Sequence, residues 1–186
     1  VLAHGDEMEE VVVISARNHR TLDDTPLRVQ ILGAEELREK ANMKPGDIRM
    51  MLNESTGIQV QQTSATSFNS SVRIQGLDGR YTQLLRDGLP VYAGFSGSLS
   101  LLQIAPLDLK QVEVVKGASS TLYGGGAIAG LINLVSKTPE ETPETALMLN
   151  ATSANGVDVS AFHSSEHDTH GVTLFASYNQ GSAYEP

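Results

Sequence analysis

A break in charge divides this chain into two unequal parts and limits the folds that it can adopt. Every Lys and Arg lies at or before Lys137, and all later residues are neutral or acidic. At the break, residues 138–144 contain two prolines and three glutamates, which is typical of a stiff, acidic connection. We therefore expect one unit before a linker at residues 139–145 and a different unit at residues 146–186.

The part before the linker, residues 16–138, mixes helix and strand signals, so we expect an α+β unit there. Two short helices are expected, one over residues 34–41 and one from Pro45 through Leu52. Between and after them lie short β-branched or apolar runs, which favour strands. The expected strands cover residues 11–14, 28–32, 57–60, 71–74, 83–86, 112–115 and 131–135.

Turn and loop signals separate these elements. Asp87-Gly88 between two apolar runs predicts a tight turn, because Gly accepts the positive φ that such turns need. The uncharged polar residues 61–71 and 91–103 predict two loops. The small residues 124–130 predict a close backbone crossing inside the globule.

Three runs of alternating apolar and polar residues follow the linker. They predict antiparallel strands at residues 146–152, 157–162 and 172–178, joined by turns at residues 153–156 and 164–171. Three strands with a free edge do not span a membrane, because unpaired backbone groups are costly in lipid. We therefore expect something beyond Pro186 to complete this sheet.

Composition excludes several classes of protein. The chain of 186 residues has 13 Lys and Arg against 22 Asp and Glu, which argues against a nucleic-acid partner because phosphate binding needs clustered cations. The absence of Cys excludes disulfides and thiolate metal sites. No run approaches the ~20 apolar residues of a membrane helix, and the first residues do not have the pattern of a secretory signal.

The sequence contains no catalytic constellation. Residues 124–130 superficially resemble a nucleotide-binding glycine loop, but a strand is expected after them where a dinucleotide fingerprint needs a helix. Ser96 lies between glycines without the strand, turn and helix of a hydrolase nucleophile. We predict no catalytic residue, no cofactor and no enzyme activity. An enzyme that uses the glycine loop is the alternative, and it would bind nucleotide.

Four ordered blocks resemble the plug domain of TonB-dependent outer-membrane receptors of the siderophore-receptor type. They are VRIQGL at residues 72–77, LLRDGLPV at 84–91, VEVVKGASSTLYG at 112–124 and AIAGLINLVSK at 127–137. In that family the plug is a mixed α/β globule inside a large outer-membrane β-barrel. The resemblance implies that residues 146–186 are the first strands of a truncated barrel.

The resemblance also implies a function, that of a gate in the outer membrane of a Gram-negative bacterium. Such a receptor takes up a scarce metal chelate, most commonly a ferric siderophore, and passes it to the periplasm with energy from TonB. Cobalamin, haem or another metal chelate is the alternative ligand. A stand-alone soluble module that keeps only the ligand-binding plug is the alternative from another class.

An acidic-then-valine segment near the N-terminus matches the family's TonB box. A short β-branched strand at a chain end suits β-augmentation, in which backbone hydrogen bonds attach it to a partner's sheet edge. The implied partner is the C-terminal domain of TonB, with the box facing the periplasm; the alternative is an ordinary first strand of the plug sheet. The segment consists of Glu9, Glu10, Val11, Val12, Val13, Ile14 and Ser15.

The two polar loops are expected to be plug apices that face the ligand, since binding residues concentrate on loops. Neither loop contains a charged residue, so both offer aromatic and neutral hydrogen-bonding contacts. The expected ligand-facing residues are Phe68, Asn69, Tyr92, Phe95 and Ser96.

Two departures from the family pattern concern the contact between plug and barrel. Gln75 and Lys116 stand where the family usually has arginines that pair with barrel carboxylates. Gln75 cannot form an ion pair and Lys116 lacks the bidentate fork of Arg, so we expect a weaker or differently built lock. The alternative is that both residues are solvated surface positions. The expected locking residues are Arg73, Gln75, Glu113 and Lys116, and the expected structural turn residues are Asp87, Gly88, Gly117, Gly124 and Gly130.

A cluster of metal-ligand residue types lies at the last expected turn. Because no helix spacing makes these side chains converge, we interpret the segment as a solvated periplasmic turn and predict no metal site. The residues are His163, Glu166, His167, Asp168 and His170.

Overall fold

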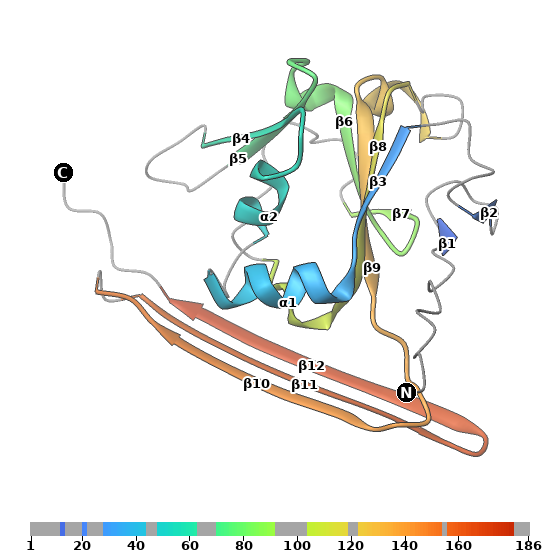
Figure 1. The fold of residues 1–186 in the computed structure, drawn as a ribbon, viewed down its shortest axis with the longest axis vertical. Coiled ribbons are helices and arrows are strands. Elements are labelled where there is room, and N and C mark those ends of the chain that lie inside the picture. Colours follow the sequence, from blue (N-terminus) through green and yellow to red (C-terminus); the bar gives the residue numbers. More distant parts are fainter. Residues whose placement is uncertain are drawn as a thin grey trace, which may run out of the picture.

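The computed structural model describes residues 12–13, 20–21, 28–43, 48–62, 70–91, 104–118, 123–153 and 156–180. This part of the chain contains a globule with a five-stranded mixed sheet and a separate three-stranded antiparallel sheet (Figure 1). The elements of the globule lie within residues 28–136, and those of the three-stranded sheet lie within residues 144–180.

The five-stranded sheet is the centre of the globule. All neighbouring strands are antiparallel except β6 and β9, which are parallel. β9 is buried along nearly its whole length, because it has a strand on each side and apolar side chains on each face. In sheet order the strands are β3 (Arg28–Leu32), β8 (Leu109–Lys116), β9 (Gly130–Ser136), β6 (Thr82–Arg86) and β7 (Leu89–Pro90).

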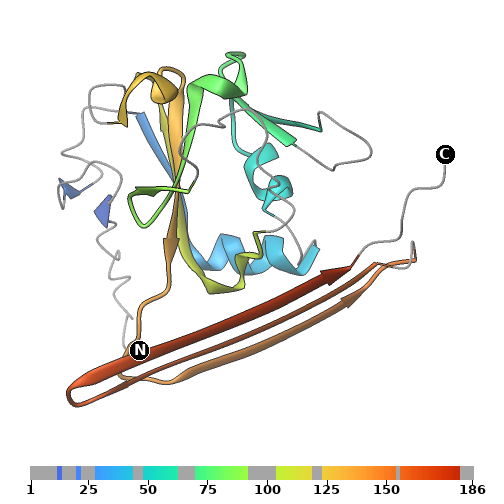
Figure 2. The same cartoon turned by 180° about the vertical axis from the view of Figure 1, so that it is seen from behind.

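Apolar side chains on the two faces of this sheet form two clusters. The larger contains Val114 and Ile132, and the smaller contains their neighbours Val115 and Leu131. Successive residues fall into different clusters because side chains alternate across a strand. The helices and a two-stranded hairpin cover the face of the larger cluster (Figures 1 and 2). These elements are α1 (Ala34–Met43), α2 (Arg49–Asn53), β4 (Ile58–Gln62) and β5 (Ser70–Ile74).

Charges at both ends support α1. Glu35 and Glu36 lie in its first turn and Lys40 in its last turn, which complements the helix dipole. Lys40 Nζ also lies 2.6 Å from Glu36 Oε1, one helical turn away. α2 begins at Arg49, later than the sequence predicts. No helix in the described ranges is long and apolar enough to cross a membrane.

Asp87 and Gly88 form the predicted tight turn between β6 and β7. Their φ angles are 50° and 78°, the positive values that a type I′ turn requires at both central residues. The Asp87 carboxylate accepts hydrogen bonds from the backbone N–H of Ser136 at 2.7 Å and from its hydroxyl at 2.8 Å. These bonds fasten the turn to the end of β9.

Gly130 lies at the close crossing that the glycine-rich segment predicts. Its φ is +139°, and a Cβ there would lie only 2.2 Å from the carbonyl oxygen of Val115. Gly117 and Gly124 also have positive φ, at 122° and 79°. The start of β9 therefore approaches β8 at a distance that only glycine permits. Two short 3₁₀ segments, η2 (Gly79–Tyr81) and η5 (Gly125–Ala127), lie at this end of the globule.

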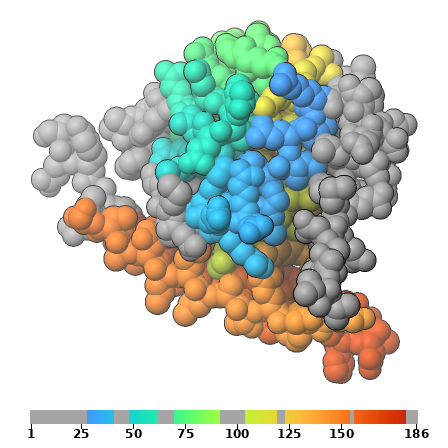
Figure 3. Space-filling model, in the orientation of Figure 1, coloured from blue at the N-terminus to red at the C-terminus, as the bar shows by residue number. Residues whose placement is uncertain are grey.

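The three-stranded sheet alternates between an apolar outer face and an inner face that is turned toward the globule. One outer row contains Leu149, Val159 and Tyr178. Leu147 on this face is 68% exposed, whereas Phe162 on the inner face is 1% exposed. The inner face lies against α1 and a third 3₁₀ segment (Figure 3). The elements are η4 (Pro106–Asp108), β10 (Glu144–Ala151), β11 (Val157–His167) and β12 (His170–Gln180).

The predicted bounds of the turn at residues 164–171 are wrong, because the turn in the structure is shorter. β11 continues through His167 and β12 begins at His170, so the turn consists of residues 168–169 alone. The polar residues before the turn extend the strand because the inner face accepts polar side chains, and Ser164 on that face is buried.

Three further boundaries differ from the prediction. β10 begins at Glu144, within the expected linker. β4 continues to Gln62 and β5 begins at Ser70, so the ends of the expected loop at residues 61–71 belong to a hairpin. In each case a strand continues into polar sequence because its backbone is paired in a ladder, which polarity alone does not reveal.

We expect Gly130→Ala to destabilise the chain by about 2–4 kcal/mol, because the new Cβ would clash with the Val115 carbonyl and the residue would keep an unfavourable φ. Gly125→Ala is the matched control, since a Cβ there meets nothing within 4 Å. Urea titration of the chain in detergent, followed by circular dichroism, measures both. Equal midpoints for the two variants would contradict the close crossing.

Candidate functional site

The sequence-predicted box and ligand loops lie largely outside the described residues. Of the box, Val12 and Val13 are described, and they form β1, which pairs antiparallel with β2 (Arg20–Thr21) in a sheet separate from the five-stranded one. The described part of the box therefore lies outside the five-stranded sheet. The residues outside the described ranges are Glu9, Glu10, Val11, Ile14, Ser15, Phe68, Asn69, Tyr92, Phe95 and Ser96.

A network of polar side chains ties the β6–β7 turn to the neighbouring strands. Arg86 forms an ion pair with Asp108, a residue that is almost fully buried, and also donates from Nε to the hydroxyl of Ser136 at 3.1 Å. Asn133 Oδ1 accepts a hydrogen bond from the backbone N–H of Gly88 at 3.0 Å. Sequence patterns do not predict these contacts, because they join residues that are far apart in the chain.

Glu113 lies in the interior of the globule, although it was expected among the locking residues. It is 0% exposed, and its carboxylate accepts hydrogen bonds from Gln111 Nε2 at 2.9 Å and Asn133 Nδ2 at 3.1 Å. A buried carboxylate needs such donors, since an uncompensated charge in the interior is strongly unfavourable. The contacts of Glu113 with these donors are thus internal to the plug and differ from a contact with a barrel wall.

Lys116 lies at the far end of β8 from the three-stranded sheet. Its ammonium donates to Gln30 Oε1 at 2.6 Å and to the backbone oxygen of Thr56, both neutral acceptors. No carboxylate of the described residues lies within ion-pair distance of it. Burial, and then the positive charge of Arg28, lower the pKa of the Lys116 ammonium from its usual value of 10.5. This cation is therefore held without a negative partner from the described chain.

Gln75 forms a turn with Gly76 at the end of β5. Its φ is 52°, Gly76 has φ 80°, and the backbone N–H of Leu77 donates to the carbonyl of Ile74 at 3.0 Å. Gln75 is exposed, and Arg73, two residues earlier, is half-buried. The structure therefore brings Arg73 and Gln75 to one end of the β4–β5 hairpin, where Gln75 also has a local role in the turn.

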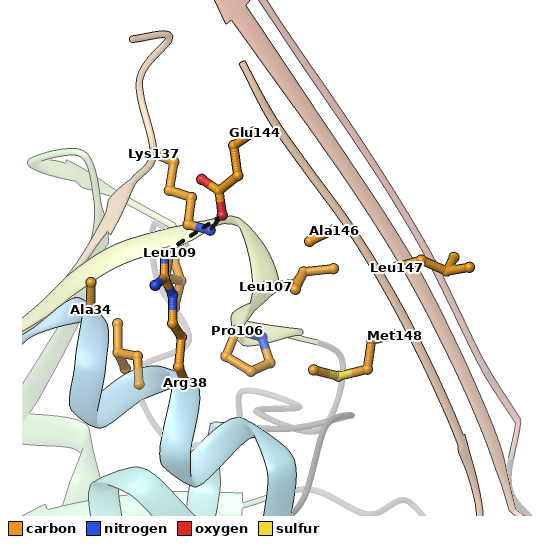
Figure 4. Close-up of a pocket in the computed structure, with 11 residues that line it drawn as sticks. Ala34, Arg38, Pro106, Leu107, Leu109, Lys137, Glu144, Ala146, Leu147 and Met148 are labelled. Atoms are coloured by element: carbon orange, nitrogen blue, oxygen red, sulfur yellow. Dashed lines mark hydrogen bonds and ion pairs between the residues drawn. The ribbon is translucent and has the colours of Figure 1, made fainter. Parts of the chain in front are cut away.

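A pocket of about 320 Å³ lies on the seam between the globule and β10 (Figure 4). α1 and η4 form one side and β10 forms the other. Lys137 Nζ lies 2.6 Å from Glu144 Oε1 at the rim, and Arg38 Nη2 lies 3.9 Å from the same oxygen. The apolar lining includes Leu37, Leu107, Leu109, Ala146 and Met148.

The histidines near the β11–β12 turn do not form a metal centre in the described part of the chain. No group of three or more His, Cys, Asp or Glu residues there converges as metal ligands would. The rings of His167 and His170 pack edge to face with centroids 5.9 Å apart, and His163 Nδ1 lies 2.9 Å from the Thr145 hydroxyl. Their contacts are those of paired strands.

Comparison with known families decides what kind of globule this is. The model of the TonB-dependent Receptor Plug Domain family matches residues 21–131, more than half of the chain. The chain belongs to this plug family. The family assignment confirms the resemblance of the four sequence blocks, and the mixed sheet followed by antiparallel strands confirms the expected fold class.

Relatives of this plug are receptors and transporters by name. The chain is 32% identical over 167 residues to the ferric aerobactin receptor of Klebsiella pneumoniae, covering 83% of this chain and 20% of that protein. It is 28% identical over 151 residues to the vitamin B12 transporter BtuB of Vibrio vulnificus, covering 80% and 24%. The chain thus spans about a quarter or less of the length of these relatives.

Solved structures agree on the fold. The pyoverdine outer membrane receptor FpvA from Pseudomonas aeruginosa PAO1, bound to pyoverdine, superposes with a TM-score of 0.75 at 19% sequence identity. The superposition covers 91% of this chain and 24% of that one, so it includes both the plug and strands after it.

We expect the stability contributed by Lys116 to rise with pH. Since the folded pKa is lowered, the unfolded chain binds more protons than the folded chain between that pKa and 10.5, and stability increases through this window. The unfolding free energy of the wild type minus that of Lys116→Met should therefore increase as pH rises from neutral toward 10.5. Urea titrations across this range measure it, with the exposed Lys110→Met as control. A difference that does not change with pH would contradict the assignment.

Proposed function

We propose that this chain is the gate and the first wall strands of an outer-membrane transporter that takes up a ferric siderophore with energy from TonB. The observation that carries the proposal is the seating of a plug globule against three strands whose opposite face is apolar. The similarity to a ferric aerobactin receptor supports the siderophore as ligand.

The outer face of β10–β12 supports a position against membrane lipid. Leu147, Leu149 and Leu174 on this face are 68%, 69% and 62% exposed. Apolar area costs roughly 25 cal/mol per Å² when it stays in water, so a face of this kind needs an apolar environment. It argues against the alternative of a stand-alone soluble plug module, which would expose this face to water.

The positions of β1–β2 and of the β4–β5 hairpin support a separation between TonB binding and ligand capture. Figures 1 and 2 show β1 and β2 on one side of the five-stranded sheet and the β4–β5 hairpin on the other. The hairpin flanks residues 63–69, which belong to one proposed ligand-facing loop. Ligand capture and the TonB-binding segment would therefore act on opposite sides of the same sheet, as a gate that couples the outside to the periplasm requires.

The short pairing of β1 supports the assignment of residues 9–15 as the TonB box. Within the described residues, β1 pairs with β2 through two residues, and this small sheet is separate from the five-stranded one. Releasing so short a pairing breaks few hydrogen bonds, so the segment is available for β-augmentation onto the sheet edge of TonB.

The surroundings of Lys116 support a lock, that is, a contact that fixes the plug to a part of the barrel beyond the described strands. It lies at the end of β8 opposite the seam with β10, beside the cation Arg28 and with neutral hydrogen-bond partners. A wall carboxylate would relieve the repulsion between these two cations and restore the ordinary pKa of Lys116. In this lock Lys116 and Arg28 together replace the missing arginine, while Gln75 contributes a neutral contact.

Cobalamin is the second candidate ligand. A vitamin B12 transporter is among the relatives at 28% identity, close to the 32% of the ferric aerobactin receptor. The uncharged residues 91–103 suit either a neutral cobalamin or a chelate bound through aromatic and hydrogen-bonding contacts.

Uptake by the full-length receptor in outer membranes tests the function and the ligand together. We expect labelled ferric siderophore to enter only when the inner membrane is energised. Energy-dependent uptake of cobalamin instead would replace the siderophore with the second candidate. Binding of either ligand without energy-dependent uptake would overturn the transporter assignment.

We expect Val12→Pro to abolish energy-dependent uptake while leaving ligand binding at the cell surface unchanged. Proline removes the backbone N–H that strand pairing with TonB would use. Val12→Thr keeps that N–H and the β-branched shape, so it should retain most of the uptake. Both variants are compared with the wild type by the uptake of labelled ligand. Full uptake by the proline variant would contradict the box.

A further inference from the structure

We propose that Lys137, Glu144 and Phe162 form a closed joint that fixes the plug to the first wall strands. Lys137 directly follows β9, Glu144 is the first residue of β10, and Phe162 lies on the inner face of β11. The joint goes beyond the gate function, because it concerns how the two units are held together and does not depend on the ligand.

The Lys137 ammonium is the centre of the joint. It lies 2.6 Å from Glu144 Oε1 and 4.7 Å from the centroid of the Phe162 ring. The Lys137 side chain is 15% exposed, the Glu144 side chain is 38% exposed, and Phe162 is 1% exposed. Cation–π and ionic contacts are stronger where water is excluded, so this cation binds two wall strands more firmly than a surface ion pair would.

The backbone of Lys137 is fixed to the plug at the same point. Its N–H donates to the carbonyl of Asp108 in η4 at 2.8 Å. The carboxylate of Asp108 is in turn paired with Arg86 at the end of β6. The contacts of Lys137 therefore continue through η4 into the central sheet of the plug.

Apolar packing and the linker itself close the seam around this ion pair. Met148 of β10 packs against the main core cluster of the plug, and Leu107 of η4 lines the same pocket. In the linker, the ring of Pro139 lies so close to β12 that a Cβ at Gly171 would approach it to 2.7 Å. Each of the three wall strands thus meets the plug or its linker at one end of the sheet.

A second ion pair, between Lys110 and Glu140, is more exposed than the pair of Lys137 and Glu144 and serves as a comparison. Lys110 Nζ lies 4.0 Å from Glu140 Oε1, with side chains 52% and 71% exposed. Exposed pairs of this kind contribute little, because water screens them and the side chains lose entropy. The same Lys→Met substitution at Lys137 and Lys110 therefore compares a largely buried cation with an exposed one.

Hydrogen exchange in the full-length receptor, reconstituted in lipid nanodiscs, tests the joint. We expect Lys137→Met to raise exchange about tenfold in the peptides that cover the end of β9, the linker and the start of β10. Lys137→Arg keeps the charge and should stay near the wild type. Phe162→Leu removes the ring but keeps apolar volume, and it should raise exchange in the same peptides by a smaller factor.

A double-mutant cycle decides whether the residues act together. Lys137→Met with Glu144→Gln should raise exchange by less than the product of the two single effects, because both variants remove the same contact. Lys110→Met should leave exchange unchanged. The proposal is overturned if Lys137→Met changes exchange by less than about twofold, or if Lys110→Met changes it as much as Lys137→Met does. It is also overturned if the effect of the double variant equals the product of the two single effects. None of these readouts depends on uptake, so the joint and the transport function fail separately.

Discussion

A buried amide in the middle of β9 holds the plug sheet together. Asn133 is fully buried, and its side chain accepts from the N–H of Gly88 in the β6–β7 turn while donating to Glu113 of β8. Removing one partner would leave a buried polar group unsatisfied, at a cost of about 1–3 kcal/mol. The strands on both sides of β9 and the turn beyond them therefore share one polar centre inside an apolar core.

Much of this plug could be predicted from local sequence. The Asp87-Gly88 turn follows from the positive φ that its residues accept, and the runs at residues 112–115 and 131–135 are apolar enough to be buried strands. The close crossing at Gly130 follows from the small residues around it. What sequence could not reveal were pairs such as Arg86 with Asp108, because nothing local fixes which distant residues a fold brings together.

The errors have a common physical origin. Polarity at residues 164–167 predicts a turn, yet β11 continues through them because a wall strand has an inner face that accepts polar side chains. The same ambiguity concealed Glu144, which looks like one more acid of a solvated linker but begins β10 beside Lys137. Of the candidate site, the sequence could therefore identify the turn residues and Lys116, the cation at the end of β8 far from the three-stranded sheet. It could not identify the seam between the globule and β10, because the residues of the seam lie on both sides of the linker.

The division of the joint between two units limits how such receptors can be recombined. Consider a hybrid receptor in which this plug is joined at the linker to the barrel of another receptor. Lys137 and Arg38 would then be transferred with the plug, while Glu144 and Phe162 would stay with the original barrel. The transplanted plug would then carry two cations into a wall that was not selected to receive them. A hybrid cut after Phe162 keeps all four residues together, so the natural module boundary for exchange lies in β11 and not at the prolines of the linker.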